Sequence, residues 1–356
     1  MMDLRASAAA AGLGFWLLIS ASPALSQTNV GTTAAPFLTL GVGARATGMG
    51  GAFVAQADDP STLFWNSGGV AEFGDAQLLF QHSSWLAGID FEYLGAIAPG
   101  VAGGVVGASI TLLDLGEMAV TTVDEQEGTG EKFRSRDLAI GLAYAASLTD
   151  RFSMGGQVKY IRQTIWHEAA TGWALDVGTV YRIGWRNMSI GSSVSNFGTR
   201  MRMEGLDLRT TNDLDEQIDG NNANTPGVLE VSRWNLPLLF RTGIALDLLQ
   251  SELMPTRLAL DAIHPNDNTE SLNLGVEARP AELLALRIGW NRLRVRNALE
   301  SMGLDIERDP SIEGGLTMGA GLAIDLPGVV HLAVDYAWAD YGRLDSTQFF
   351  TLGLRF

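Results

Sequence analysis

The feature of this chain that most constrains its fold is a series of segments, each about ten residues long, in which apolar residues alternate with polar or small ones. In the clearest of them, residues 329–338, an extended backbone places Val330 and Leu332 on one side and His331 and Ala333 on the other. A period of two is that of a β-strand, and about nine or ten residues is the length with which a tilted strand crosses a bilayer. The pattern therefore predicts membrane-spanning strands.

The number of these segments points to a closed sheet. An even number is required in a bacterial outer-membrane barrel, because both ends of the sheet start on the same side of the membrane and must pair. We identify about fourteen segments, near residues 76–84, 90–98, 101–112, 136–147, 152–163, 171–182, 186–196, 235–247, 255–264, 270–279, 283–291, 314–325, 329–338 and 346–356.

The connections between segments give a second, independent test. Those after even-numbered segments are short: 99–100, 148–151, 184–187, 248–254, 280–282 and 326–328. Most of those after odd-numbered segments are longer: 113–135, 164–170, 197–234, 265–269, 292–313 and 339–345. Short turns on one rim and long loops on the other are typical of outer-membrane barrels, with the short rim periplasmic. The sequence thus predicts an all-β fold, a transmembrane antiparallel β-barrel of about fourteen strands.

Two stretches have a competing interpretation. Residues 93–113 are nearly uncharged and long enough for a transmembrane helix, but Pro99-Gly100 and the glycines that follow favour a hairpin of two strands. At the C-terminus, Phe350, Leu352, Leu354 and Phe356 share one face of a predicted strand. This ending resembles the signal by which barrel-assembly machinery recognises its substrates; the alternative is the last strand of a soluble sheet.

The N-terminal residues predict export. Arg5 supplies a positive charge, residues 8–19 form an apolar stretch, and Ala24-Leu25-Ser26 provides a small-x-small cleavage site. We expect a signal peptide over residues 1–26 and a mature chain from Gln27. The alternative is a retained membrane anchor, which the short apolar stretch disfavours.

Composition narrows the possible partners. The net charge of −16 argues against nucleic acid, because phosphate binding requires clustered Lys and Arg. The chain has no cysteine, which excludes disulfides and thiolate chemistry and is compatible with an exported bacterial protein.

Between the leader and the first segment lies a stretch, residues 41–73, that has no strand pattern. It begins with closely spaced glycines, at positions 41, 43, 48, 50 and 51, which predict a tight turn with close backbone approach. Asp59 and Pro60 then suit the N-cap and first position of a short helix over residues 61–65, ended by Asn66 and Gly68-Gly69. Such a compact insert must be enclosed by another part of the chain.

The run from Gly43 to Asn66, GARATGMGGAFVAQADDPSTLFWN, resembles the N-terminal signature of the PorV/PorQ-type outer-membrane proteins, part of the wider FadL-like barrel superfamily. The chain departs from that signature at residues 67–71, Ser-Gly-Gly-Val-Ala, where the family has Pro-Ala-Gly-Leu-Ala. The resemblance implies an outer-membrane barrel with an N-terminal hatch, and a function in protein export of the type IX kind. We accordingly expect a hatch over residues 27–75 and a barrel over residues 76–356.

Two sets of residues are candidates for function. In the hatch, charged, apolar and amide side chains can contact the barrel wall and act as a gate or simply fill the lumen: Arg45, Met49, Phe53, Asp58, Asp59, Phe64, Trp65 and Asn66. On the strands, charges on inward faces predict ion pairs in the lumen, because lipid-facing charges are costly: Lys159, Asp176, Arg241, Asp261, Arg287 and Asp335. These ion pairs either stiffen the wall or serve transport.

Other chemistry finds little support in the sequence. The four histidines lie on different segments without metal-ligand spacing, and no G-x-S-x-G nucleophile elbow is present. The acidic loop at residues 212–220 lacks the glycine of an EF-hand and reads as a solvated surface loop. We therefore expect no catalytic residues, no metal and no cofactor.

The function implied by the resemblance is that of a non-enzymatic outer-membrane component of protein secretion. Its partners would be outer-membrane lipid and secreted cargo proteins or subunits of the secretion machinery. The alternative, from the same superfamily, is FadL-like transport of hydrophobic small molecules such as long-chain fatty acids. Both readings place the protein in the bacterial outer membrane.

Overall fold

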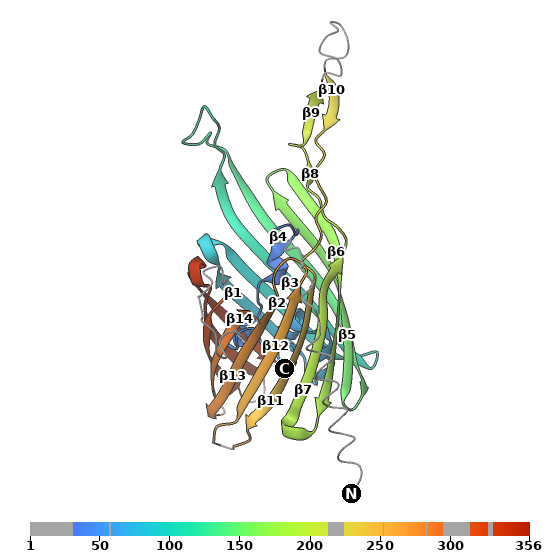
Figure 1. The fold of residues 1–356 in the computed structure, drawn as a ribbon, viewed down its shortest axis with the longest axis vertical. Coiled ribbons are helices and arrows are strands. Elements are labelled where there is room, and N and C mark those ends of the chain that lie inside the picture. Colours follow the sequence, from blue (N-terminus) through green and yellow to red (C-terminus); the bar gives the residue numbers. More distant parts are fainter. Residues whose placement is uncertain are drawn as a thin grey trace, which may run out of the picture.

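The computed structural model of the protein describes residues 31–56, 58–212, 224–251, 253–281, 283–294, 314–326 and 330–356. The predicted signal peptide and most of the acidic loop lie outside these residues. Fourteen antiparallel strands of the described chain close into a barrel, as predicted (Figure 1). Strands adjacent in sequence pair with one another, and the first pairs with the last in a register that runs from Gln77 opposite Arg355 to His82 opposite Phe350.

The barrel strands agree closely with the predicted segments. They are β1 (Gln77–Ser84), β2 (Asp90–Val101), β3 (Gly104–Ala119), β4 (Lys132–Thr149), β5 (Phe152–Ile165), β6 (Glu168–Ile183), β7 (Met188–Gly198), β11 (Leu239–Leu249), β12 (Thr256–Pro265), β13 (Ser271–Ala281), β14 (Leu284–Arg294), β15 (Leu316–Leu326), β16 (Val330–Asp340) and β17 (Ser346–Arg355). Residues 93–113 form parts of the β2–β3 hairpin, as the glycines and the proline predicted.

Two of the predicted long loops are shorter or more ordered than expected. Strands β3 to β6 extend beyond the rest of the barrel at the long-loop rim (Figure 1), so that the predicted loop 164–170 is reduced to Trp166 and His167. The predicted loop 197–234 contains β8 (Glu204–Gly205), which pairs with β6, and a separate hairpin of β9 (Arg209–Asn212) and β10 (Thr225–Val228). Backbone pairing of β6 with β5 and β8 therefore continues into the predicted loops.

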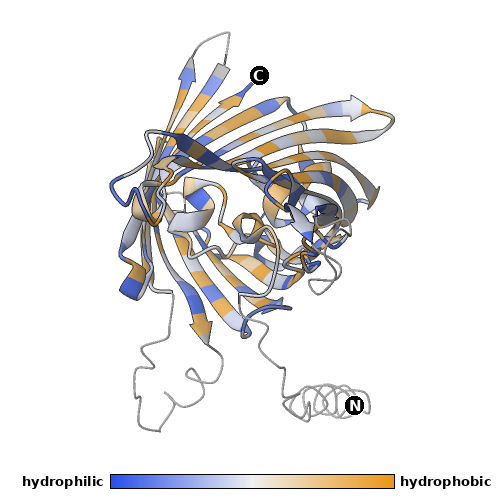
Figure 2. Ribbon diagram, turned by 90° about the horizontal axis from the view of Figure 1, so that it is seen from above, coloured by the Kyte–Doolittle hydropathy of each residue, from blue (hydrophilic) through white to orange (hydrophobic). Residues whose placement is uncertain are grey.

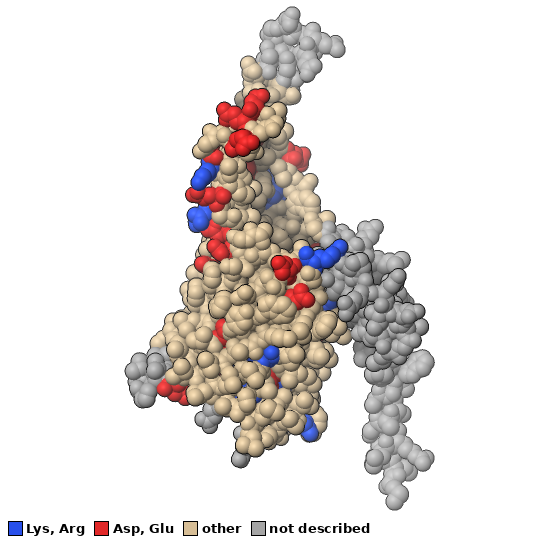
Figure 3. Space-filling view, turned by 90° about the vertical axis from the view of Figure 1, so that its left-hand side faces the viewer, with Lys and Arg blue, Asp and Glu red and all other residues tan. Residues whose placement is uncertain are grey.

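The wall has an apolar outer face and a polar inner one. On β17, the outward Phe350 and Leu352 are 50% and 41% exposed. The alternate residues Phe349 and Thr351 face the lumen and are buried. Figure 3 shows the outcome: charge gathers at the long-loop end, and the band below it carries few charged residues. None of the described helices has the length and apolarity to cross a membrane.

The hatch lies inside the barrel. Viewed from above, short helical pieces fill the ring of strands (Figure 2). They are η1 (Pro36–Thr39), α2 (Ala44–Gly48), α3 (Thr62–Trp65) and η2 (Ser67–Glu72), and three further 3-10 turns, η3 (Leu86–Gly88), η4 (Trp185–Asn187) and η5 (Gly342–Leu344), lie in connections of the wall.

The hatch corrects two details of the sequence prediction. The glycine-rich stretch is not only a turn, because Ala44 to Gly48 form a helix between Gly43 and the left-handed Gly50 and Gly51. The second helix begins later than predicted, with Ser61 at the N-cap position; the Asp59 carboxylate instead accepts a hydrogen bond from the Ser61 amide at 2.8 Å. The chain leaves this helix at Asn66, as predicted, and continues as η2.

Candidate functional site: the lumen hatch

The hatch occupies the lumen from one rim to the other. At the long-loop rim, Thr33 donates a hydrogen bond of 2.7 Å to Asp267, which lies in the connection between β12 and β13. At the short-turn rim, Glu72 forms an ion pair with Arg182, close to the end of β6. The hatch is thus tied to the wall at both ends.

Glycines on the inner face of the wall make room for the hatch. A Cβ atom at Gly178 of β6 would overlap the Asn66 side chain, and one at Gly191 of β7 would overlap the Val54 carbonyl. The same holds at other strands, where the overlap would be with the hatch residues Leu63, Ser67, Met49 and Gly50: Gly107, Gly155, Gly275 and Gly289. The hatch therefore contacts the wall directly at its backbone, which leaves little space for a continuous path beside it.

Polar side chains of the wall satisfy the backbone amides of the hatch. Asp261, completely buried on β12, accepts hydrogen bonds from the Phe53 and Val54 amides at 2.7 and 2.9 Å. Thr317 of β15 and Thr351 of β17 accept from Gly50 and Ala44 in the same way, at 2.9 and 2.8 Å. An irregular buried segment needs such partners, because an unpaired amide inside the lumen costs about 1–3 kcal/mol.

A group of charges with a buried centre links the hatch to the wall and is here termed the Glu277 cluster: Arg45, Asp58, Glu277, Arg279, Arg287 and Asp335. Glu277 of β13 accepts hydrogen bonds from Arg45 at 2.8 and 2.9 Å, and its carboxylate lies 2.7 Å from Arg287 of β14. Arg45 also contacts Asp58 of the hatch at 2.7 Å, and Arg287 contacts Asp335 of β16 at 2.6 Å. One wall carboxylate thus joins a hatch arginine to two further strands.

Two hatch groups have perturbed pKa values. Burial alone would lower the pKa of Arg45, but the carboxylates of Asp58 and Glu277 raise it well above its ordinary value, so Arg45 stays charged. Burial raises the pKa of Asp59 to about 6, although Arg45, 3.9 Å away, acts in the opposite direction. Asp59 is therefore the hatch group whose charge changes near neutral pH.

An aromatic corner holds the middle of the hatch. The guanidinium of Arg241, buried on β11, lies 5.3 and 5.5 Å from the ring centroids of Phe64 and Trp65, within the range of cation–π attraction. The Trp65 indole donates to the Val42 carbonyl at 2.8 Å, and the Asn66 amide donates to Val54 and to Thr179 of β6 at 2.8 and 3.0 Å.

Nearer the long-loop rim, Lys159 and Asp176 pair within the wall at 2.8 Å. Asp176 also accepts a hydrogen bond of 2.8 Å from the backbone amide of Asn196, at the point where the register between β6 and β7 shifts. These two charges and several apolar hatch residues surround a small cavity of about 20 Å³, whose apolar lining includes Leu38, Leu63 and Phe64.

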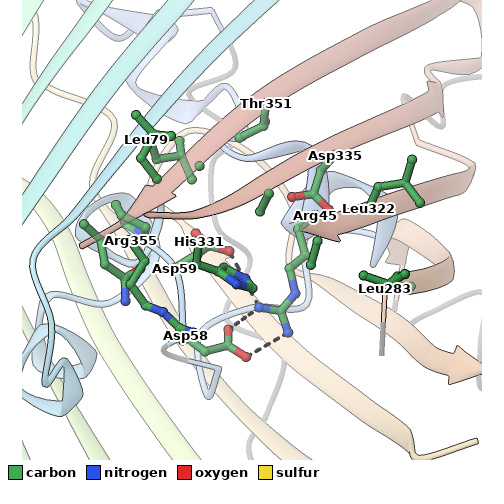
Figure 4. A pocket seen from close by; sticks show the side chains of 18 of the residues that line it. Arg45, Asp58, Asp59, Leu79, Leu283, Leu322, His331, Asp335, Thr351 and Arg355 are labelled. Atoms are coloured by element: carbon green, nitrogen blue, oxygen red, sulfur yellow. Dashed lines mark hydrogen bonds and ion pairs between the residues drawn. The ribbon is translucent and has the colours of Figure 1, made fainter. Parts of the chain in front are cut away.

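A larger cavity of about 280 Å³ lies at the short-turn side of the hatch (Figure 4). Its inner wall is formed by Arg45, Asp58, Asp59 and the lumen faces of β14 to β17. Figure 4 shows Arg355 and His331 on the strands beside the Arg45–Asp58 pair. The cavity is therefore next to the Glu277 cluster and lined largely by charged and small residues.

Comparison with known proteins identifies the family. A family model described as type IX secretion system protein PorV matches residues 23–204, just over half of the chain, including the hatch and the strands up to β7. The chain belongs to the PorV family. A search of curated proteins found no match.

Solved structures with the same fold as this PorV-family chain are FadL-like barrels. The toluene transporter TbuX of Ralstonia pickettii has a TM-score of 0.53 and 10% identity, with 88% of this chain and 97% of that chain covered. The toluene transporter TodX of Pseudomonas putida has a TM-score of 0.52 and 11% identity, with 88% and 96% covered. At such low identity these likenesses show the fold alone. The fold and the family together imply the outer membrane.

The structure separates the predicted residues into contacting groups. Arg45, Asp58, Arg287 and Asp335 come together in the Glu277 cluster, with Asp59 beside it, and Lys159 pairs only with wall groups. Met49 and Phe53 are fully buried packing residues of the hatch. Sequence reasoning missed Glu277 itself. Its alternation with outward Leu274 and Val276 was the signal that places it on the inner face.

Proposed function

We propose that this protein is a non-enzymatic outer-membrane component of type IX-type export, which holds secreted cargo or partner proteins at the bacterial outer membrane. The observation that carries the proposal is the PorV family match over the hatch and half of the barrel. A lumen filled by a segment that contacts the wall through its backbone suits a protein that binds partners better than one that conducts solutes.

The protruding long-loop end offers a surface for a protein partner. Val228 and Leu229, at and after the end of β10, are 72% and 56% exposed, although apolar side chains are usually withdrawn from water. Because they lie on a hairpin beyond the barrel wall, lipid does not account for their exposure (Figure 1). Under this proposal they belong to the surface that contacts cargo or the secretion machinery.

Affinity purification from native outer membranes tests the proposal. We expect the intact protein to retain protein partners, identified by mass spectrometry, and a deletion strain to keep cargo in the periplasm. Val228→Ser combined with Leu229→Ser should weaken retention. Leu253→Ser, at an 85% exposed leucine in the connection between β11 and β12, serves as the control. Recovery of lipid-like ligands without any protein partner would refute the secretion role.

The second candidate is passage of hydrophobic small molecules, which the apolar lining of the cavity near Leu38 and Phe64 favours. At about 20 Å³ that cavity has room for little more than one water molecule, so transport would require the hatch to move. Deleting residues 41–73 should raise single-channel conductance in planar bilayers if the hatch closes the lumen. Unchanged conductance would show that it does not.

A further inference from the structure

The cavity at the short-turn side contains a row of hydrogen-bond donors that the hatch does not use. Arg355 of β17 lies between Gln77 of β1 and His331 of β16 in the strand register, so that the three share one face of the sheet. All three line the cavity. They form the last inward-facing row before the short-turn rim, where the cavity can be reached from outside the lumen.

The charges around this row are unequally paired. Each carboxylate that lines the cavity already has a partner: Asp58 binds Arg45, Asp335 binds Arg287, and Asp59 accepts the Ser61 amide. The guanidinium of Arg355, by contrast, makes no hydrogen bond or ion pair with any residue that the structure describes. Arg355, which is exposed, is therefore the cationic group of the cavity that is available to an incoming anion.

Small residues next to the row create the space for such an anion. Gly353 lies one inward position above Arg355, between Leu79 and Ala333 in the register, and Gly321 lies opposite Asp335. The resulting volume of about 280 Å³ is far more than a single water needs, and leucine side chains such as Leu79 and Leu283 provide an apolar border. A ligand with a body larger than a bare ion fits this combination.

We propose that this cavity binds an acidic peptide segment, with one carboxylate held by Arg355 and Gln77. The neighbouring His331 is already engaged, because its Nδ1 contacts Asp325. The hatch segment Asp58-Asp59-Pro60 lines the same cavity, so the site already accommodates an acidic stretch of backbone beside its arginines (Figure 4). The choice of a peptide over other carboxylate ligands rests on the proposed function, because exported chains would arrive at the periplasmic, short-turn rim. The planar guanidinium of Arg355 can bind both oxygens of such a carboxylate in a bidentate pair.

Fluorescence anisotropy with purified protein in nanodiscs tests the site, using labelled tetraglutamate as the probe and tetraglutamine as the uncharged comparison. We expect tetraglutamate to bind and tetraglutamine not to bind. Arg355→Gln should weaken binding about tenfold or more, because the charge-assisted hydrogen bonds to the carboxylate are lost. Arg343→Gln, an arginine at the opposite rim, is the matched control and should leave binding unchanged.

Because Arg355 lies on β17, the strand that closes the barrel against β1, its substitution can affect barrel assembly, and Gly353→Leu provides a second test. A Cβ atom at Gly353 makes only ordinary contacts, the nearest 3.5 Å away, so the leucine should fill the cavity without straining the strand. Absence of tetraglutamate binding, equal binding of tetraglutamine, binding unaffected by both variants, or equally effective displacement by inorganic phosphate would overturn the assignment. The measurement does not depend on secretion, so its failure is distinguishable from failure of the proposed function.

Discussion

The wall holds the hatch by different means on its two sides. Along β13 to β16, buried charges join them, with Glu277 between Arg45 and Arg287. Along β5 to β7, the contacts inside the lumen are uncharged, and the one charged link, between Glu72 and Arg182, lies at the short-turn rim. There Gly178 and Gly191 let the wall approach the hatch closely, as Gly275 and Gly289 also do on the charged side. The charged side depends on charge compensation among the buried groups Arg45, Glu277 and Arg287, and the glycine side depends on the absence of side-chain volume. The two sides should therefore fail under different perturbations.

The largest effect should come from removing the shared carboxylate. Glu277→Gln leaves Arg45 and Arg287 buried with too few negative partners, and breaking a buried ion pair in this way costs about 3–5 kcal/mol. We expect a lower urea midpoint for unfolding and faster protease cleavage within the hatch. Glu270→Gln, which removes an exposed carboxylate just before the same strand, should change neither. An unaltered midpoint in the Glu277 variant would mean that water already solvates this cluster.

A smaller effect is expected on the glycine side. In Gly178→Ala, the added methyl group would overlap the Asn66 side chain, and overpacking of this kind typically costs about 1–3 kcal/mol. The loss should be the same at low and high salt, because no charge is involved. Gly156→Ala is the matched control, since a Cβ atom there has its nearest neighbour at 3.5 Å. A strong salt dependence of the Gly178 variant would remove the distinction between the two sides.

The same contrast explains how far sequence reasoning reached. Every strand of the wall faces lipid on one side and the lumen on the other, so the alternation recurs in all fourteen strands. Each segment can therefore be assigned as a strand from its own sequence. The hatch has no repeated environment. The helix over Ala44–Gly48 was hidden by the glycines in and around it. Many hatch contacts also depend on wall residues more than two hundred positions away, such as Glu277 for Arg45 and Thr351 for Ala44.

The wall glycines were equally difficult to interpret. In sequence, Gly178 and Gly191 are small residues at inward positions, compatible with any strand of a barrel. Only the path of the hatch shows that Asn66 and Val54 require those positions to lack a side chain. Period-two alternation therefore determines which face a residue occupies, whereas the identity of its partner depends on the folded hatch.

The smallest expected effect concerns pH and lies at the edge of the charged side. The pKa of Asp59 is raised to about 6 from an ordinary 3.8, so the hatch favours its neutral form. That contribution is complete below about pH 3.8 and is lost as the pH rises through about 6, where the buried group must ionise. Asp59→Asn keeps an oxygen for the Ser61 amide but cannot ionise. It should therefore stabilise the protein at pH 8 by about 1–2 kcal/mol and have little effect at pH 4.

Urea unfolding of the Asp59 variant and the parent protein at both pH values measures this difference directly. Asp75→Asn, a carboxylate in the exposed chain just before β1, controls for the change in net charge. If the parent protein were instead the more stable of the two at pH 8, attraction to Arg45 at 3.9 Å would outweigh burial. Asp59 would then belong to the Glu277 cluster. The charged contact between hatch and wall would extend one residue further along the hatch than the pKa of Asp59 indicates.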